Sequence, residues 1–341
     1  MIKFCSFIIV ILTFFSCSQQ EIEEKRNNTC GGTIKLPIDS DISTLFPPAI
    51  ISESEKQIVS QFHLGLFKYN AQNTTLEPGI CKNWDIDNTG KVYIFHLDST
   101  VFFHDDNCFP GGKGRNITAY DVEYTFYLLS TPSAYNKNFT NTVSRILGAK
   151  EYFKKIQTTT GEKPHIPGIQ ILDKYTLKIT LETPSVLFLY NLAHPAASIL
   201  PQEGIKKYDS DCKIGAGPFI YDWQRDSQYI VLTRNKHFFM FDKADMRLPY
   251  LDTILLIKTK NQQHSIDLFV NNQTDALLYV ETDKIQDILN LKKDSIQYKL
   301  TKSYANLEGN NTLYNIYSES IHDFYTNNLH ILDLTKVFIK K

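Results

Sequence analysis

The longest apolar run of the sequence spans only twelve residues, Phe4 to Phe15, and it lies at the N-terminus. A helix that crosses a membrane needs about 20 apolar residues, so this run is too short to span one. Lys3 precedes it, and a positive charge ahead of a short apolar stretch is typical of a secretory signal peptide. No later stretch reaches 18 consecutive apolar residues. We therefore expect an exported chain whose body is soluble.

A cysteine, Cys17, stands directly after the apolar run. Phe14-Phe15-Ser16-Cys17 resembles the lipobox of bacterial lipoproteins, and the polar run Ser18 to Asn28 follows at once, as in a tether. We expect a signal peptide over residues 1–16, a lipid on Cys17 and a tether over residues 17–30, which would anchor the protein to a membrane of the cell envelope. An ordinary signal peptide with an incidental cysteine and an uncleaved anchor are the alternatives.

The composition of the chain is that of an ordinary globular protein, because 42% of its 341 residues are hydrophobic and 21% are charged. At about 150 residues per domain, this length allows about two domains. The formal net charge is −1, from 36 basic and 37 acidic residues. Proteins that bind nucleic acids normally carry a basic excess, so we expect no nucleic-acid partner.

Six cysteines occur, at positions 5, 17, 30, 81, 108 and 212. The last four remain if the first leaves with the signal peptide and the second carries lipid, and an exported protein can pair such residues as disulfides. Their wide spacings match no CxxC pattern of zinc or redox sites. We expect isolated thiols and keep disulfides as the alternative.

Hydrophobic periodicity predicts a mixed α/β body. Apolar residues at helical spacing predict helices over 54–67, 118–129, 265–270 and 283–291, and a short helix or apolar loop over 186–192. Runs rich in β-formers predict strands over 33–37, 91–97, 101–104, 169–181 around a turn at Asp173-Lys174, 228–233 and 252–260. Thr118 and Asp121 are placed to cap the second helix. The continuous apolar run Ile254–Ile257 predicts burial on both faces of its strand.

Eight segments follow one another in a specific order: Phe62–Tyr69, Leu76–Ile80 with Trp84, Tyr93–Leu97, Val101–Asp106, Ile117–Val122, Ile214–Phe219, Arg234-Asn235 and Leu248–Asp252. Together they resemble the family 5 extracellular solute-binding proteins, which are the oligopeptide, dipeptide and nickel receptors of ABC importers. The resemblance covers the chain from about Gly32 to about Leu300.

The resemblance implies an α/β fold of the periplasmic-binding-protein type II, with mixed sheets and flanking helices. It implies lobe I over 31–75 and 196–278, a small β-rich subdomain over 76–195, and the start of lobe III over 279–341. A hinge between the lobes would lie near Leu278 to Asp283. Members of the family continue well beyond residue 341 and the family's pattern fades after Tyr298, so we expect an incomplete second lobe in a truncated chain.

The function that the resemblance implies is ligand capture without catalysis. The protein would be a monomeric, lipid-anchored, extracytoplasmic component of an ABC transporter that holds peptides between its lobes and delivers them to the permease subunits. Such sites hold extended peptides through backbone hydrogen bonds, with wet pockets for the side chains. A non-binding remnant lipoprotein of the same family and a receptor for nickel or another solute are the alternatives. An exported hydrolase comes third, and no G-x-S-x-G or H-E-x-x-H motif supports it.

The predicted ligand contacts come from segments that border the cleft in the family. They are Phe46, His63, Gly65, Gly215, Ala216, Gly217 and Phe219. Purely structural roles are the alternatives: core packing for Phe46, turn geometry for Gly217-Pro218 and a buried structural role for His63.

We assign no metal, cofactor or catalytic residue. His104, Asp105, Asp106 and Cys108 are close in sequence, and carboxylates with a histidine can bind a divalent ion. The same residues resemble a strand end followed by a turn in the family, and we prefer that structural interpretation.

Overall fold

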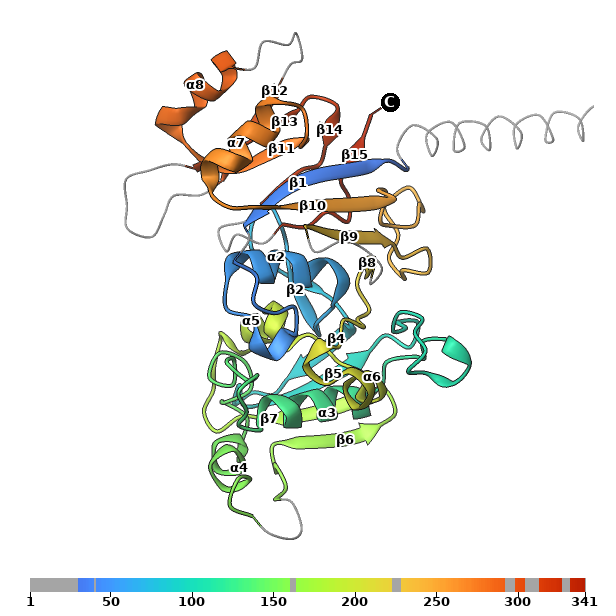
Figure 1. Ribbon diagram of the computed structural model, residues 1–341. Coiled ribbons are helices and arrows are strands. Elements are labelled where there is room, and N and C mark those ends of the chain that lie inside the picture. Colours follow the sequence, from blue (N-terminus) through green and yellow to red (C-terminus); the bar gives the residue numbers. More distant parts are fainter. Residues whose placement is uncertain are drawn as a thin grey trace, which may run out of the picture.

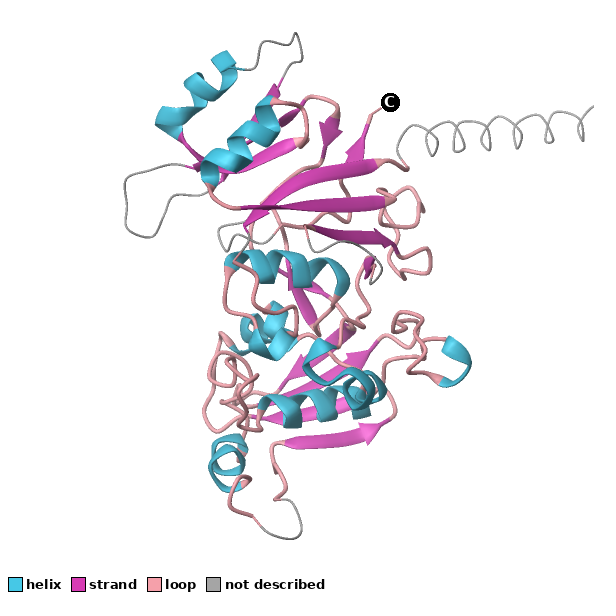
Figure 2. Ribbon diagram, viewed as in Figure 1, coloured by secondary structure: helices cyan, strands magenta, loops and turns pink. Residues whose placement is uncertain are grey.

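A computed structural model gives the fold of the chain (Figures 1 and 2). It describes residues 30–39, 41–159, 164–222, 228–291, 298–303, 313–326 and 332–340. The expected signal peptide, Cys17 and most of the tether lie outside the described residues. In Figure 1 three sheet-containing bodies, which we call upper, middle and lower, follow one another along the molecule. The predicted α/β class, with mixed sheets and flanking helices, is confirmed.

The middle body contains a four-stranded sheet in the order β1-β10-β9-β8. Its strands are β1 (Thr33–Asp39), β8 (Phe219–Tyr221), β9 (Tyr229–Arg234) and β10 (Thr253–Thr259). β1 and β10 are parallel, and the other two pairs are antiparallel. On β10, Ile254 and Leu256 are buried whereas Leu255 and Ile257 are only partly buried. The prediction that both faces are buried is therefore wrong, because neighbouring elements cover one face of this strand only partly.

Helix α2 (Glu53–Phe62) lies beside the middle sheet (Figure 1). It begins with a capping box: the Ser52 hydroxyl accepts from the Glu55 N–H at 3.2 Å, and the Glu55 carboxylate accepts from the Ser52 N–H at 3.0 Å. The helix ends five residues before the predicted end at Phe67. It ends there because the Gly217 N–H donates a hydrogen bond to the Phe62 carbonyl at 3.0 Å and the backbone becomes extended at His63.

The lower body contains a second antiparallel sheet in the order β4-β5-β7-β6. Its strands are β4 (Cys81–Ile86), β5 (Val92–Leu97), β6 (Ile169–Asp173) and β7 (Thr176–Thr180). Helices α3 (Ala119–Leu129) and α4 (Ala149–Lys155) belong to the same body. The Asp121 carboxylate accepts from the Thr118 N–H at 2.9 Å, so the predicted cap is present. The predicted strand 101–104 is reduced to one bridge between Phe102 and Asn116.

The upper body contains a three-stranded sheet in the order β11-β13-β12 and two helices. Its elements are α7 (Gln262–Val270), β11 (Ala276–Glu281), α8 (Thr282–Leu291), β12 (Tyr298–Ser303) and β13 (Leu313–Ser318). Phe269, Leu277 and Ile316 form its small core. The proposed hinge segment, Leu278 to Asp283, is the end of β11 and the start of α8.

After β13 the chain returns to the middle body. Strands β14 (Ile321–His322) and β15 (Phe338–Ile339) pair with each other near the start of β1 (Figure 1). Phe324, Leu332, Leu334 and Val337 are buried in the same core as β1 and β10. The sequence pattern gives no sign of this packing, because short extended segments leave too few residues for a recognisable period.

Smaller elements connect these bodies. They are the hairpin β2 (Phe67–Tyr69) and β3 (Leu76–Pro78), helices α5 (Phe188–Ala193) and α6 (Gln202–Tyr208), and the 3-10 turns η1 (Pro47–Ala49), η2 (Pro110–Gly112), η3 (Pro195–Ala197) and η4 (Asp209–Asp211). Among the residues that the structure describes, none of the helices is long and apolar enough to cross a membrane.

Candidate functional site

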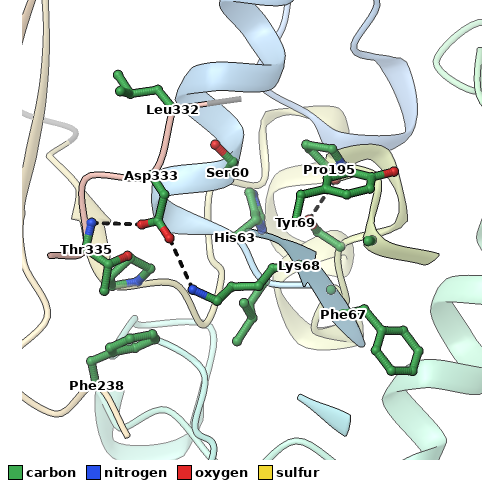
Figure 3. A pocket seen from close by; sticks show the side chains of 15 residues that line it. Ser60, His63, Phe67, Lys68, Tyr69, Pro195, Phe238, Leu332, Asp333 and Thr335 are labelled. Atoms are coloured by element: carbon green, nitrogen blue, oxygen red, sulfur yellow. Dashed lines mark hydrogen bonds and ion pairs between the residues drawn. The ribbon is translucent and has the colours of Figure 1, made fainter. Parts of the chain in front are cut away.

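Two of the predicted contact residues, His63 and Gly65, line one pocket at the end of α2 (Figure 3). We call it the His63 pocket. Its other lining residues are Ser60, Leu64, Phe67, Lys68, Tyr69, Ala193, Pro195, Ser198, Pro218, Phe238, Leu332, Asp333 and Thr335. The free volume is about 50 Å³. This space admits one or two water molecules and is far smaller than the pockets that hold small-molecule ligands.

His63 is the buried polar group of this pocket. Its side chain is 1% exposed, and neither ring nitrogen has a hydrogen-bond partner among the described residues. Burial, helped by the nearby His104, lowers the pKa of His63 well below 6.5, so the ring is neutral. A neutral imidazole offers one donor and one acceptor, and here both can serve a water molecule or a small polar group in the pocket.

A partly buried ion pair closes the other side of the pocket. Lys68 Nζ lies 3.1 Å from the Asp333 carboxylate (Figure 3). It also lies 3.3 Å from the carboxylate of Glu77. Burial acts to lower the pKa of Lys68, but the two carboxylates outweigh it and the pKa is raised. Gln61 binds the same segment, since its Oε1 accepts from the Leu334 N–H at 3.3 Å. The segment 332–335 is thus held against α2 and β2.

The predicted Gly215–Phe219 loop lies against the end of α2 at distances that only glycine permits. A Cβ atom on Gly215 would stand 2.0 Å from the Phe62 carbonyl oxygen, and one on Gly217 would stand 2.6 Å from the Phe62 carbonyl carbon. His104 holds this loop from the other side. Its N–H donates to the Gly215 carbonyl at 2.8 Å, and its Nε2 to the Gly217 carbonyl at 2.9 Å.

The remaining predicted contacts are packing residues in this structure. Phe46 is 5% exposed and packs with Ala49 and Leu200. Ala216 and Phe219 are buried in the hydrophobic cores on either side of the loop. Only His63 and Gly65, with Pro218 from the loop, come together at one pocket.

A wider hollow opens beside Phe46, between η1 and the middle sheet. We call it the Tyr135 hollow. Its lining residues are Ile42, Ser43, Thr44, Leu45, Ala49, Ile51, Ala134, Tyr135, Lys137, Ser210, Asp211, Lys213, Tyr221, Tyr229, Ile230 and Lys258. Its volume of about 520 Å³ falls in the range of small-molecule sites. Sequence reasoning missed it, because its residues come from six separate segments and share no local motif.

The His104 cluster is a structural feature. Asp106 accepts from the Tyr208 hydroxyl at 3.0 Å and from the Cys108 N–H at 2.7 Å, while His104 holds the glycine loop. Within the described residues, no group of three His, Cys, Asp or Glu side chains is placed to hold a metal ion. Cys30, Cys81, Cys108 and Cys212 are free thiols, and burial raises the pKa of Cys81 to about 12.

Known proteins of similar sequence are receptors for small solutes. The chain is 30% identical to di/tripeptide-binding protein 1 of Pseudomonas aeruginosa over 189 residues. These residues are 52% of this chain and 33% of the relative. It is 27% identical to the dipeptide-binding protein of Escherichia coli, over 67% of this chain and 40% of the relative. A third relative, 29% identical over 63% of this chain and 39% of its own length, is heme-binding protein A of Haemophilus influenzae.

Solved structures of the same kind share the fold. A periplasmic oligopeptide-binding protein of Borrelia burgdorferi matches with a TM-score of 0.64 and 27% identity, over 80% of this chain and 53% of that one. A periplasmic binding protein of Helicobacter pylori, solved in complex with the peptide STSA, matches with a TM-score of 0.66 and 20% identity, over 83% of this chain and 52% of that one. The chain spans about half the length of these structures and less of the curated relatives.

The family model for the middle part of the bacterial extracellular solute-binding proteins of family 5 matches residues 75–327, which is most of the chain. The match takes in the lower body, the middle sheet from β8 onward and the upper body. Relatives and solved structures point to the same group of proteins. This chain therefore belongs to family 5 of the bacterial extracellular solute-binding proteins, which bind their ligands and are not enzymes.

Proposed function

We propose that this protein captures peptides outside the cytoplasmic membrane and delivers them to the permease subunits of an ABC importer. The observation that carries the proposal is the family match together with relatives named as dipeptide- and tripeptide-binding proteins. Other relatives are named for heme and glutathione, and one solved structure of similar fold holds nickel with L-histidine. Peptides are the ligand class named most often among the first relatives.

The Tyr135 hollow is the place that we propose for the peptide, because it has the room that the His63 pocket lacks. A peptide carries a charge of each sign at its two ends. Lys137 and Lys258 offer ammonium groups for a carboxylate. Asp211 and Lys213 pair with each other at 3.3 Å, and a peptide terminus would compete with this partly exposed pair. The Tyr135 side chain is 51% exposed and gives an aromatic surface for a peptide side chain.

The anchor of this receptor would be a lipid on Cys17, which lies outside the described residues. The described body begins at Cys30, so twelve residues would separate the lipidated cysteine from the body. A tether of this length would leave the receptor close to its membrane and to the permease subunits.

Thermal unfolding of the purified full chain tests the proposal. Dialanine, trialanine and a tetrapeptide mixture should raise the melting temperature by several degrees, since ligand at about 100 times its dissociation constant stabilises a protein by about 2.7 kcal/mol. Tyr135→Ala should weaken peptide binding by about tenfold, whereas Tyr120→Ala, which removes another exposed tyrosine, should not change it. A monodisperse chain that responds to none of these peptides would contradict the proposal and favour a non-binding member of the family.

A further inference from the structure

A second large pocket lies between the lower and the middle body, whose sheets Figure 1 shows. We call it the Arg247 pocket. It lies between the connection from β5 to α3 and the loop that follows β9, and its volume is about 740 Å³. The first wall consists of Thr100, Phe102, Phe103, His104, Asp105, Lys113 and Gly114; the second consists of Ile220, Arg234, Asn235, Lys236, His237, Phe239, Phe241 and Arg247.

The charge of this pocket is positive. Four lining side chains, Lys113, Arg234, Lys236 and Arg247, are cationic, and Asp105 is the only acidic one. Asp105 is neutralised within its own wall, because Lys113 Nζ lies 2.7 Å from its carboxylate. The second wall therefore presents three cationic side chains and, among its described residues, no carboxylate.

Each of these three cationic side chains can still form a contact with an anionic ligand. Lys236 forms no ion pair with any residue in the described part of the chain. Arg234 Nη1 is 4.0 Å from the Asp252 carboxylate, and its Nη2 donates to the Arg247 carbonyl at 3.1 Å. Its ion pair is long, so an anion in the pocket can still approach the guanidinium. Arg247 donates to the Phe238 carbonyl, at 2.6 Å from Nη1. A guanidinium has five N–H donors, so Arg247 can still form a two-pronged contact with an anion.

The apolar part of the pocket is aromatic. Phe102 on one wall and Phe241 on the other are each 47% exposed, which is a large exposure for phenylalanine. The Arg247 guanidinium lies 4.4 Å from the centre of the Phe241 ring, so a cation and a flat apolar face stand side by side. Such a pairing matches a ligand in which an anionic group is attached to a flat ring.

From this arrangement we propose that the Arg247 pocket binds a small anionic molecule that carries a flat apolar ring, such as an aryl phosphate or an aryl carboxylate. The anion lies between Arg234, Lys236 and Arg247, and the ring lies between Phe102 and Phe241. The volume is sufficient for a ligand of this kind. The site is separate from the Tyr135 hollow, so the inference does not rest on peptide binding.

Isothermal titration of the full chain with phenyl phosphate tests the inference. Phenyl phosphate should bind saturably, and phenol and inorganic phosphate should each bind more weakly, because each keeps only half of the contacts. Lys236→Gln should weaken phenyl phosphate binding about two- to fivefold, the range of a single exposed ion pair. Phe102→Ala should weaken it further without changing the affinity for inorganic phosphate. Both side chains are exposed or unpaired, so neither variant should impair folding.

Lys206→Gln on α6 is the matched control, since it removes an exposed lysine outside the pocket, and it should leave binding unchanged. Absence of saturable binding by phenyl phosphate would overturn the inference, and so would binding that Lys236→Gln and Phe102→Ala do not alter. Vesicles of phosphatidylglycerol provide a further arm. If they bind through Lys236 while phenyl phosphate does not bind, the pocket recognises a membrane surface and the inference is wrong.

Discussion

Two histidines, the buried His104 and the partly buried His194, make the stability of this protein depend on pH. His104 and His194 are neutral inside the fold, because burial, which is the largest influence on each, lowers both pKa values to about 4. His194 Nδ1 accepts from the Ala196 N–H at 3.1 Å, and a proton on that nitrogen would break the contact. In the unfolded chain the same histidines would titrate near 6.5.

We expect stability to fall as the pH falls from 7 to 5. Because the folded pKa of His194 is lower than the unfolded one, the unfolded chain binds more protons in this window, and acid favours unfolding. Urea unfolding at both values should show that the wild type loses about 2 kcal/mol more than His194→Gln does. His96→Gln, which removes an exposed histidine, should behave like the wild type. An equal loss in the wild type and in His194→Gln would contradict this account.

At the scale of elements, the short segment 332–337 contributes both core residues and an ion pair to the middle body. It brings Leu332, Leu334 and Val337 into the core of the middle body and Asp333 to Lys68 on β2. Lys68 and Asp333 are 265 residues apart in the sequence. Burial would raise the pKa of Asp333, but the Lys68 ammonium and the hydrogen bonds from Thr335 outweigh it and hold the pKa below 3.8. The carboxylate therefore stays charged and keeps the segment in place.

Asp333→Asn should destabilise the protein by about 1–3 kcal/mol, since it weakens a partly buried charged contact. The stabilising effect of Asp333 is present above the unfolded pKa and is lost as the pH falls through the lower folded pKa, so the two proteins should converge in strong acid. Urea unfolding measures the difference, and hydrogen exchange at 332–337 should show faster local opening. Glu182→Gln, which removes a more exposed pair with Lys150, should cost less than about 1 kcal/mol. Equal effects of the two changes would contradict the proposed role of Asp333.

The elements that the sequence predicts best are those whose signal is local. The alternation of Tyr175 to Leu181 and the cap at Thr118 identify β7 and the start of α3 without any other part of the chain. Helix α2 ends at Phe62 and not at the predicted Phe67, because the N–H of Gly217, which is far away in sequence, binds the Phe62 carbonyl. The candidate sites also divide into those with a local sequence signal and those formed by distant segments. His63 and Gly65 lie in one local segment and line the same pocket, whereas Lys68–Asp333 and the Tyr135 hollow need tertiary contacts between distant segments.

At the scale of the whole molecule, the N-terminal end of the body enters beside the Arg247 pocket. The Gly31 N–H donates to the Tyr250 carbonyl at 2.7 Å, and Cys30 packs against the cluster of Phe238, Met246 and Leu248. The loop that carries Arg247 belongs to this cluster. A tether that ends at Cys30 would therefore hold this end of the body nearest to the membrane, and would leave the Tyr135 hollow on a separate part of the surface.

The mass of the N-terminal peptide of the native protein extracted from membranes tests the anchor on which this orientation depends. We expect an N-terminal peptide that begins at Cys17 and carries acyl chains, because lipidation of that thiol would accompany removal of residues 1–16. Cys17→Ala should abolish the added mass and leave the protein unprocessed, since both lipidation and cleavage need that thiol. Cys30→Ala is the control, and it should keep the lipid and the membrane association. An N-terminal peptide that keeps residues 1–16 and carries no lipid would contradict the anchor, and the membrane-facing position of the Arg247 pocket would then have no basis.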